Sequence, residues 1–189
     1  MKMKHFFLSA LMSSSLLSVS AIAADTGTIT FNGSVTDTTC KVDIGGSGAD
    51  GTVNLPPVST TALNTPGNTV GKTRFTLQLS DCSGAALSTA TAKAFFQPGN
   101  SVDSATGRLL NQAGGGAATN VSLQLRDGQD DTVINAGAAS QTTHTAGFVD
   151  ISGADIGTAS LPYFVEYYAE GSASAGAVTS QVTYNIIYQ

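Results

Sequence analysis

Few residues of the chain have the types and spacing that catalysis needs. A serine triad requires a histidine as its general base, and outside the first ten residues only His144 is present, in the polar run SQTTHTAG. Because its neighbours are threonine or small residues, we interpret His144 as a solvated loop residue. Glu166 and Glu170 flank YYA on an expected strand. A glycosidase pair would need a carboxylate across a cleft, so surface charges are the simpler interpretation.

Metal and phosphate sites are equally poorly supported. The run RDGQDD at 126–131 has three aspartates but lacks the spacing and the bidentate glutamate of a calcium loop, which favours a solvated turn. The glycine run 114–116 does not precede a Lys-Ser/Thr pair, as a phosphate-binding loop does. Cys40 and Cys82 are too far apart for a zinc spacing. The sequence therefore predicts no enzyme, no metal site and no cofactor.

The first 23 residues are typical of a secretory signal peptide. They have a basic start, a serine-rich apolar centre from Phe6 to Val19, and small residues at Ala21 and Ala23, which predict cleavage before Ala24. A signal anchor is the alternative, which the short centre disfavours. No other stretch is long enough to span a membrane, so we expect an exported protein without a membrane span in its mature part.

Export also affects the two cysteines. In an oxidising compartment, a disulfide between Cys40 and Cys82 is the expected state, and two free thiols are the alternative. The net charge is −5, which excludes the basic surface that nucleic-acid binding needs.

Composition and periodicity both favour an antiparallel β-sandwich. Only 11% of the residues are charged, and short alternating segments are separated by glycine-rich turns. We see no internal repeat and no second globular domain. Strands are expected near residues 28–35, 38–42, 52–55, 73–79, 91–96, 120–126, 132–134, 147–151, 163–169 and 178–188.

The two ends of the chain carry alternating apolar segments. The C-terminal run GAVTSQVTYNIIYQ has its apolar residues at even positions, apart from Ile187. The segment GTITFNGSV has Ile29, Phe31, Gly33 and Val35 on one face. Asn32-Gly33 is a hairpin signal, but the apolar residues stay in phase across it, so one continuous strand fits as well. On alternation alone, each segment is an ordinary sandwich strand that faces its own core.

In this order, these features resemble the pilin subunits of the bacterial chaperone–usher type, close to the major subunits of type 1-like fimbriae. The resemblance covers the whole chain: the signal peptide, the extension with a central glycine, the cysteines in TTCKVD and FTLQLSDC, Gly176 fourteenth from the end and a penultimate Tyr188.

The resemblance implies an all-β fold, an incomplete immunoglobulin-like sandwich lacking its last strand, with an N-terminal donor-strand extension. It implies a signal peptide at 1–23, the extension at 24–36 and a pilin domain at 37–189. Neighbouring pilin subunits, a periplasmic chaperone and an outer-membrane usher are the implied partners, and a fimbria on the cell surface is the implied location. The donor residues would be Ile29, Phe31, Gly33 and Val35, and the strand that contacts chaperone and donor would use Gly176, Val178, Val182, Tyr184, Ile186 and Tyr188.

Two alternatives stay open at this stage. A minor adaptor or tip subunit would share most of these features. A self-complete secreted sandwich that binds sugars would share the fold but would not need a partner's strand.

Overall fold

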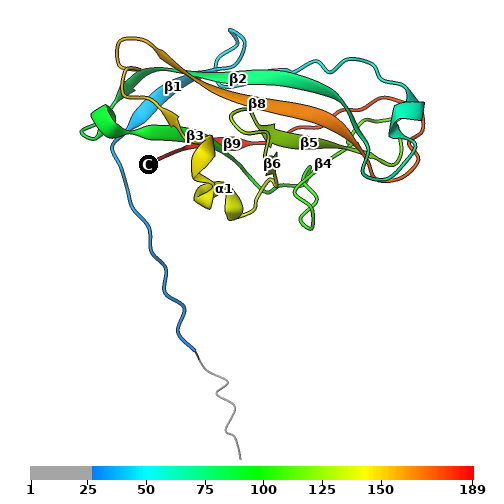
Figure 1. Ribbon diagram of the computed structural model, residues 1–189, viewed down its shortest axis with the longest axis horizontal. Helices are drawn as coiled ribbons and strands as arrows, with labels where there is room; N and C mark the ends of the chain where they lie inside the picture. Colours follow the sequence, from blue (N-terminus) through cyan, green and yellow to red (C-terminus); the bar gives the residue numbers. More distant parts are fainter. Residues whose placement is uncertain (1–26) are drawn as a thin grey trace, which may run out of the picture. The chain divides into compact units, whose positions relative to one another are not determined.

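The computed structural model describes residues 27–189 (Figure 1). The expected signal peptide and its cleavage site lie outside this range. The chain divides into two units after Ser34, and every strand belongs to the second unit, which runs from Val35 to Gln189. Residues 27–34 form no strand.

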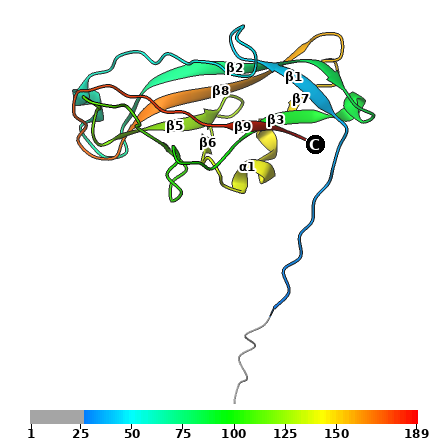
Figure 2. The ribbon, with the colours of Figure 1, turned by 180° about the vertical axis from the view of Figure 1, so that it is seen from behind.

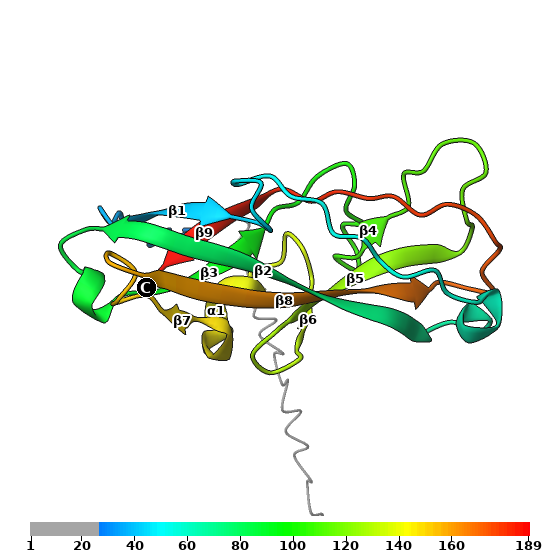
Figure 3. The same cartoon turned by 90° about the horizontal axis from the view of Figure 1, so that it is seen from above.

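The larger sheet of the second unit is antiparallel throughout. Its long strands β2 and β8 pair over most of their length, from Thr69 opposite Tyr168 to Ser80 opposite Thr158 (Figure 3). The order is β1-β2-β8-β5-β4, and β6 also pairs with β5. The bounds are Thr39–Asp43 for β1, Thr69–Ser83 for β2, Leu109–Leu110 for β4, Val121–Asp127 for β5, Val133–Ile134 for β6 and Thr158–Ala169 for β8.

The smaller sheet has the order β7-β3-β9 and contains the C-terminal strand (Figure 2). Its strands are β3 (Thr91–Phe96), β7 (Val149–Asp150) and β9 (Tyr184–Tyr188). The helical elements are single turns: α1 (Ser140–Thr143) and the 3₁₀ turns Thr60–Leu63, Leu87–Thr89 and Thr145–Gly147. Within the described residues, no helix has the length and apolar character needed to cross a membrane.

The core lies between the two sheets and confirms the β-sandwich. Leu77 of β2 and Leu161 of β8 are fully buried against Ala94 and Phe96 of β3. Tyr163 packs edge-on against Phe96, with ring centroids 5.1 Å apart. The Tyr163 hydroxyl accepts a hydrogen bond from the Ala94 N–H at 2.7 Å, so its polar atom is satisfied inside the core.

Most expected strands are present, and β3 has the predicted bounds. Two expected strands are absent: residues 28–35 and 52–55 form none. A strand requires a partner for its main-chain groups, and alternation alone cannot provide one. Val53 and Leu55 nevertheless pack against the core. The two-residue strand β4 and the turn α1 were not expected from the sequence.

Candidate functional site

The C-terminal strand β9 lies at the edge of its sheet. In the part of the chain that the structure describes, β9 pairs only with β3. Thr91 and Gln189 exchange two main-chain hydrogen bonds of 2.9 Å, and Gln97 donates one to Thr183. Because bonded and non-bonded pairs alternate along an antiparallel ladder, the odd-numbered residues of β9 bond to β3. The even-numbered residues therefore direct their N–H and C=O groups to the free edge.

The side chains of the same even-numbered residues face the core. Tyr184, Ile186 and Tyr188 are half-buried and pack against the core cluster, whereas Asn185 is exposed. The alternation continues upstream without a regular strand, because Val178, Ser180 and Val182 are half-buried and the odd positions are exposed. Ile187 is the exception that the sequence already showed: it is half-buried on the polar face.

The first part of the domain provides a facing set of half-buried apolar side chains. These also pack against the core, and they are Cys40, Val42, Ile44, Val53 and Leu55. Two tyrosine hydroxyls connect the last strand to this first part of the domain: that of Tyr188 accepts from the Cys40 N–H at 3.1 Å, and that of Tyr184 donates to the Ala49 carbonyl at 2.7 Å. Burial raises the pKa of Tyr188, and the bond from Cys40 opposes this rise.

We call this region the open edge: the free side of β9 with residues 176–183, together with the facing side chains just named. Figure 3 labels β1 and β9 near one another. They belong to different sheets, and no main-chain hydrogen bond joins them among the described residues. Half-buried apolar side chains and free main-chain groups thus occur together at the open edge.

A small apolar pocket of about 190 Å³ lies where the C-terminal segment begins. Its lining includes Val58, Leu63, Tyr167, Gly176 and Val178. The chain passes Gly176 at very close range, because a Cβ placed there would lie 2.3 Å from the Ala118 nitrogen. Only glycine fits here. The structure thus gives Gly176 a packing role that the sequence resemblance did not identify.

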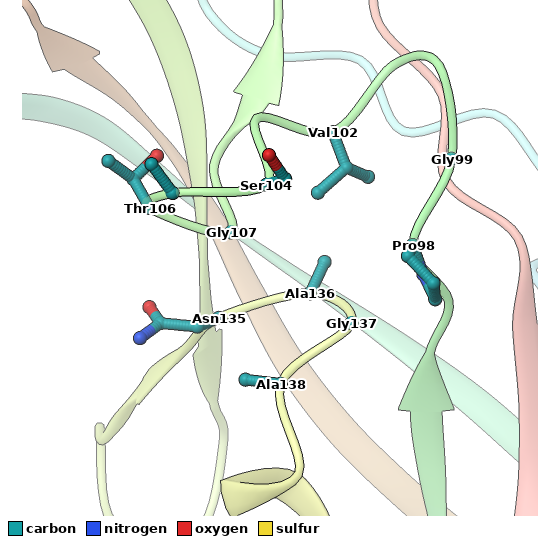
Figure 4. Close-up of a pocket in the computed structure, with 11 residues that line it drawn as sticks. Pro98, Gly99, Val102, Ser104, Thr106, Gly107, Asn135, Ala136, Gly137 and Ala138 are labelled. Carbon is teal, nitrogen blue, oxygen red and sulfur yellow. The ribbon is translucent and has the colours of Figure 1, made fainter. Parts of the chain in front are cut away.

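A second pocket, of about 250 Å³, lies between the loops 98–107 and 135–138 (Figure 4). Figure 4 shows small side chains around it, such as Ser104, Thr106 and Ala136. None of its lining residues carries a charge. The residues that line this pocket therefore offer no ionisable side chain for acid–base chemistry.

The donor residues expected from the sequence are solvent-exposed. Ile29 is 77% exposed, Phe31 88% and Val35 102%, and a Cβ added to Gly33 would meet nothing within 4 Å. Large apolar side chains exposed to this degree in one short segment are unusual for a soluble chain and mark an interaction segment. The donor role itself stays a prediction.

The disulfide joins Cys40 and Cys82, as predicted. It links β1 to the end of β2, next to the paired residues Thr39 and Ser83. The two cysteines are 42 residues apart in the sequence. Closing a loop of this length stabilises the fold by about 4 kcal/mol in the chain-entropy model.

The solvated-turn interpretation of 126–131 is wrong for Asp127. This residue is 1% exposed, and its carboxylate lies 3.8 Å from the ammonium of the equally buried Lys93. Burial lowers the pKa of Lys93, while the nearby carboxylates oppose that change. Lys93 also donates to the His144 carbonyl, and His144 Nε2 lies 2.9 Å from Asp130. His144 therefore belongs to a polar network under the α1 turn.

This network also bears on metal binding. Ligand atoms of Asp127, Asp130 and His144 lie within 4.8 Å of one another. The ammonium of Lys93 already supplies a positive charge beside Asp127, and these two residues form a buried ion pair.

The surface-charge interpretation is likewise wrong for Glu166. It is 4% exposed and accepts hydrogen bonds from Gln124 and Arg126 on β5. Glu170 is more exposed and forms a two-bond pair with Arg108. Both carboxylates are thus engaged by arginine side chains of the same sheet region.

Comparison with known proteins identifies related chains. The family model described as type-1 fimbrial protein, A, matches residues 55–189. The major fimbrial subunit SMF-1 of Stenotrophomonas maltophilia is 47% identical, over 90% of this chain and 96% of that protein. The F17 fimbrial protein of Escherichia coli is 42% identical, over 91% of this chain and 92% of that protein.

Solved structures show the same fold. A subunit from a structure of a chaperone-usher pilus, reported with the molecular basis of rod uncoiling, has a TM-score of 0.55 at 20% identity and covers 90% of this chain and 100% of its own. The P pilus rod subunit PapA has a TM-score of 0.50 at 17% identity, and the match covers 86% of this chain and 100% of PapA.

Proposed function

The chain belongs to the type-1 fimbrial protein family, and we propose that its subunits join by strand addition, with residues 27–35 of one subunit seated on the open edge of the next. As a member of this family, the protein is a structural subunit of a cell-surface fimbria and not an enzyme. The observation that carries the proposal is that, at the open edge, free main-chain groups coincide with half-buried apolar side chains.

The acceptor side follows from the needs of an edge strand. A free strand edge with an apolar face is prone to uncontrolled association unless something pairs with it. At Tyr184, Ile186 and Tyr188 the main-chain groups point to the free edge while the side chains leave part of the core exposed. An added strand would pair with these main-chain groups and cover the exposed part of the core in one step.

The donor side follows from the exposed N-terminal segment. A strand presents alternate side chains to one face, so Ile29, Phe31, Gly33 and Val35 would all enter the acceptor. Burying each of the three large side chains contributes about 1.5–3 kcal/mol. Gly33 would enter where the acceptor leaves no room for a side chain. Its conformational freedom also lets the segment straighten when it binds.

Before polymerisation the open edge needs another cover. We propose that a periplasmic chaperone lends a strand to residues 176–188 and captures the carboxylate of Gln189 with basic residues, and that an outer-membrane usher then exchanges this strand for a neighbour's extension. The proposed organisation is a signal peptide at 1–23, the donor extension at 24–36 and the pilin domain at 37–189. Since the relative SMF-1 is a major subunit, we propose the rod rather than the tip as this chain's place.

The experiment introduces one bulky side chain on either face of the donor segment. Gly33→Leu should abolish filaments, since overpacking of a tight site costs about 1–3 kcal/mol, and should leave export and the subunit fold intact. Thr30→Leu is the matched control on the polar face and should assemble normally. Val182→Asp should impair the acceptor, and with it recovery of the subunit together with the chaperone. Electron microscopy and co-purification separate these outcomes, and normal filaments from Gly33→Leu would falsify the donor assignment.

A further inference from the structure

Asn32 is the only one of the nine asparagines in the sequence that glycine follows. The sequence signals a turn at this pair, but the proposed function uses only the glycine. Asn32 lies in the exposed segment 27–34, which forms no strand, and the position of a Gly33 side chain is open. An asparagine in this setting has a known chemical instability.

We propose that Asn32 is a site of spontaneous deamidation in the unassembled subunit. The Gly33 main-chain nitrogen attacks the side-chain carbonyl carbon of Asn32 and forms a new C–N bond. The C–N bond to the side-chain amide breaks, and that nitrogen leaves as ammonia after taking up the proton from Gly33. Water then opens either carbonyl of the resulting succinimide ring and yields aspartate or isoaspartate. One water enters and one ammonia leaves, so no oxidant or cofactor is needed.

Two features of the chain favour this reaction at Asn32. Gly33 has no Cβ to shield its nitrogen and reaches conformations that other residues avoid. The side chains of other asparagines are held in place: Asn111 Nδ2 donates to the carbonyls of Ala118 and Ala177, and Asn120 Nδ2 donates to that of Ser172. Asn120 also precedes a β-branched valine, which crowds the attacking nitrogen.

The consequence for assembly rests on the proposed function. Isoaspartate adds a methylene group to the main chain between Phe31 and Gly33. Because side chains alternate strictly along a strand, this addition puts Ile29 and Phe31 out of phase with Gly33 and Val35. Once the segment is seated, pairing holds the main chain extended and keeps the ring from forming. Deamidation would thus limit how long a subunit stays able to donate its strand, while filaments are protected.

The first test needs no filament. The full-length exported subunit is incubated at mildly alkaline pH in heavy-oxygen water and digested, and its peptides are followed by mass spectrometry. The Asn32 peptide should convert several-fold faster than the Asn111 and Asn120 peptides, into both aspartate and isoaspartate. Asn32→Gln should abolish the conversion at this position, because a glutamine would need a larger ring. Equal rates for the three asparagine peptides would overturn the proposal.

The second test measures the consequence. Aged wild-type subunits should lose the ability to extend filaments while aged Asn32→Gln subunits keep it, and Asn32 in finished filaments should stay unconverted. Incorporation of isoaspartate-containing subunits at the wild-type rate, or equal conversion in filaments and free subunits, would overturn the link to assembly. If fresh chains assemble without residues 27–35, the proposed function fails, but the peptide measurement keeps its meaning.

Discussion

The hydroxyl of Tyr188 accepts a hydrogen bond from the main-chain N–H of Cys40 at 3.1 Å. Cys40 is also disulfide-bonded to Cys82, so the penultimate residue is tied to the first strand and, through it, to β2. Among the described residues, this side-chain bond joins two strands that share no main-chain pairing. Tyr188 therefore connects the two sides of the open edge without closing it.

Tyr188→Phe should lower the free energy of unfolding by about 1 kcal/mol, the usual net contribution of one hydrogen bond. The loss arises because the part-buried Cys40 N–H would have no protein acceptor. Urea unfolding of the subunit measures the change. Tyr168→Phe is the control, because the Tyr168 hydroxyl makes no hydrogen bond with any residue in the described range 27–189. An equal change in the two variants would mean that the Tyr188 bond contributes nothing specific.

Gly176→Ala should destabilise the subunit itself, before any chaperone is involved. The added Cβ would lie 2.3 Å from the Ala118 nitrogen. The two segments of the chain that meet there are held together by the hydrogen bond from the Ala118 N–H to the Ala177 carbonyl. Overpacking of this kind costs about 1–3 kcal/mol. Gly153→Ala, where an added Cβ meets nothing within 4 Å, should be neutral in the same urea assay. If the two variants were equally stable, the close approach would not require glycine.

The buried pair of Lys93 and Asp127 predicts strong coupling. Lys93→Met leaves the Asp127 carboxylate buried without its cation, which should cost about 3–5 kcal/mol. Asp127→Leu in the Lys93→Met background should restore much of this loss, because no charge stays buried. Lys41→Met removes a lysine from an exposed pair with Asp81 and should have no measurable effect. Additive losses from the two buried substitutions would contradict the coupling.

Local patterns identified most of the sandwich but not its polar interior. The strand at 91–96 was predictable from TAKAFF and its flanking turns, and the alternation at the C-terminus correctly placed Tyr184, Ile186 and Tyr188 on one face. The partner of Asp127 was not predictable, because Lys93 lies on a strand of the other sheet and only the packing of the two sheets brings them together.

Which alternating segments form a strand depends on whether a neighbouring strand is available, and the sequence pattern does not show this. The segment 28–35 alternates as well as 184–188 does, yet only the latter forms a strand, because β3 lies beside it. No sequence pattern states which main-chain groups find a partner within their own domain. Gly176 shows the same limit: glycine in a C-terminal motif could be identified, but the close approach of residues 116–118 could not.

Proline substitutions at two neighbouring positions should distinguish the folding of the subunit from its assembly into filaments. The Thr179 N–H donates to Asn111 Oδ1 at 3.0 Å, whereas the Ser180 N–H has no main-chain partner among the described residues. Proline removes the N–H in both cases. Thr179→Pro should therefore lower the stability of the subunit by about 1 kcal/mol or more. Ser180→Pro should change that stability little, since the Ser180 hydroxyl also has no hydrogen-bond partner in the described part of the chain.

Filament assembly should be affected by Ser180→Pro more than by Thr179→Pro, the opposite of the effect on stability. At Ser180 the missing N–H and the added ring lie where a donated strand would pair, and a central ladder position does not tolerate proline. Ser180→Pro subunits should therefore fold but fail to enter filaments, while any folded Thr179→Pro subunits should still enter them. Urea unfolding measures the first property, and sedimentation of filaments measures the second. Normal filaments from Ser180→Pro would show that the donated strand does not pair along residues 176–183.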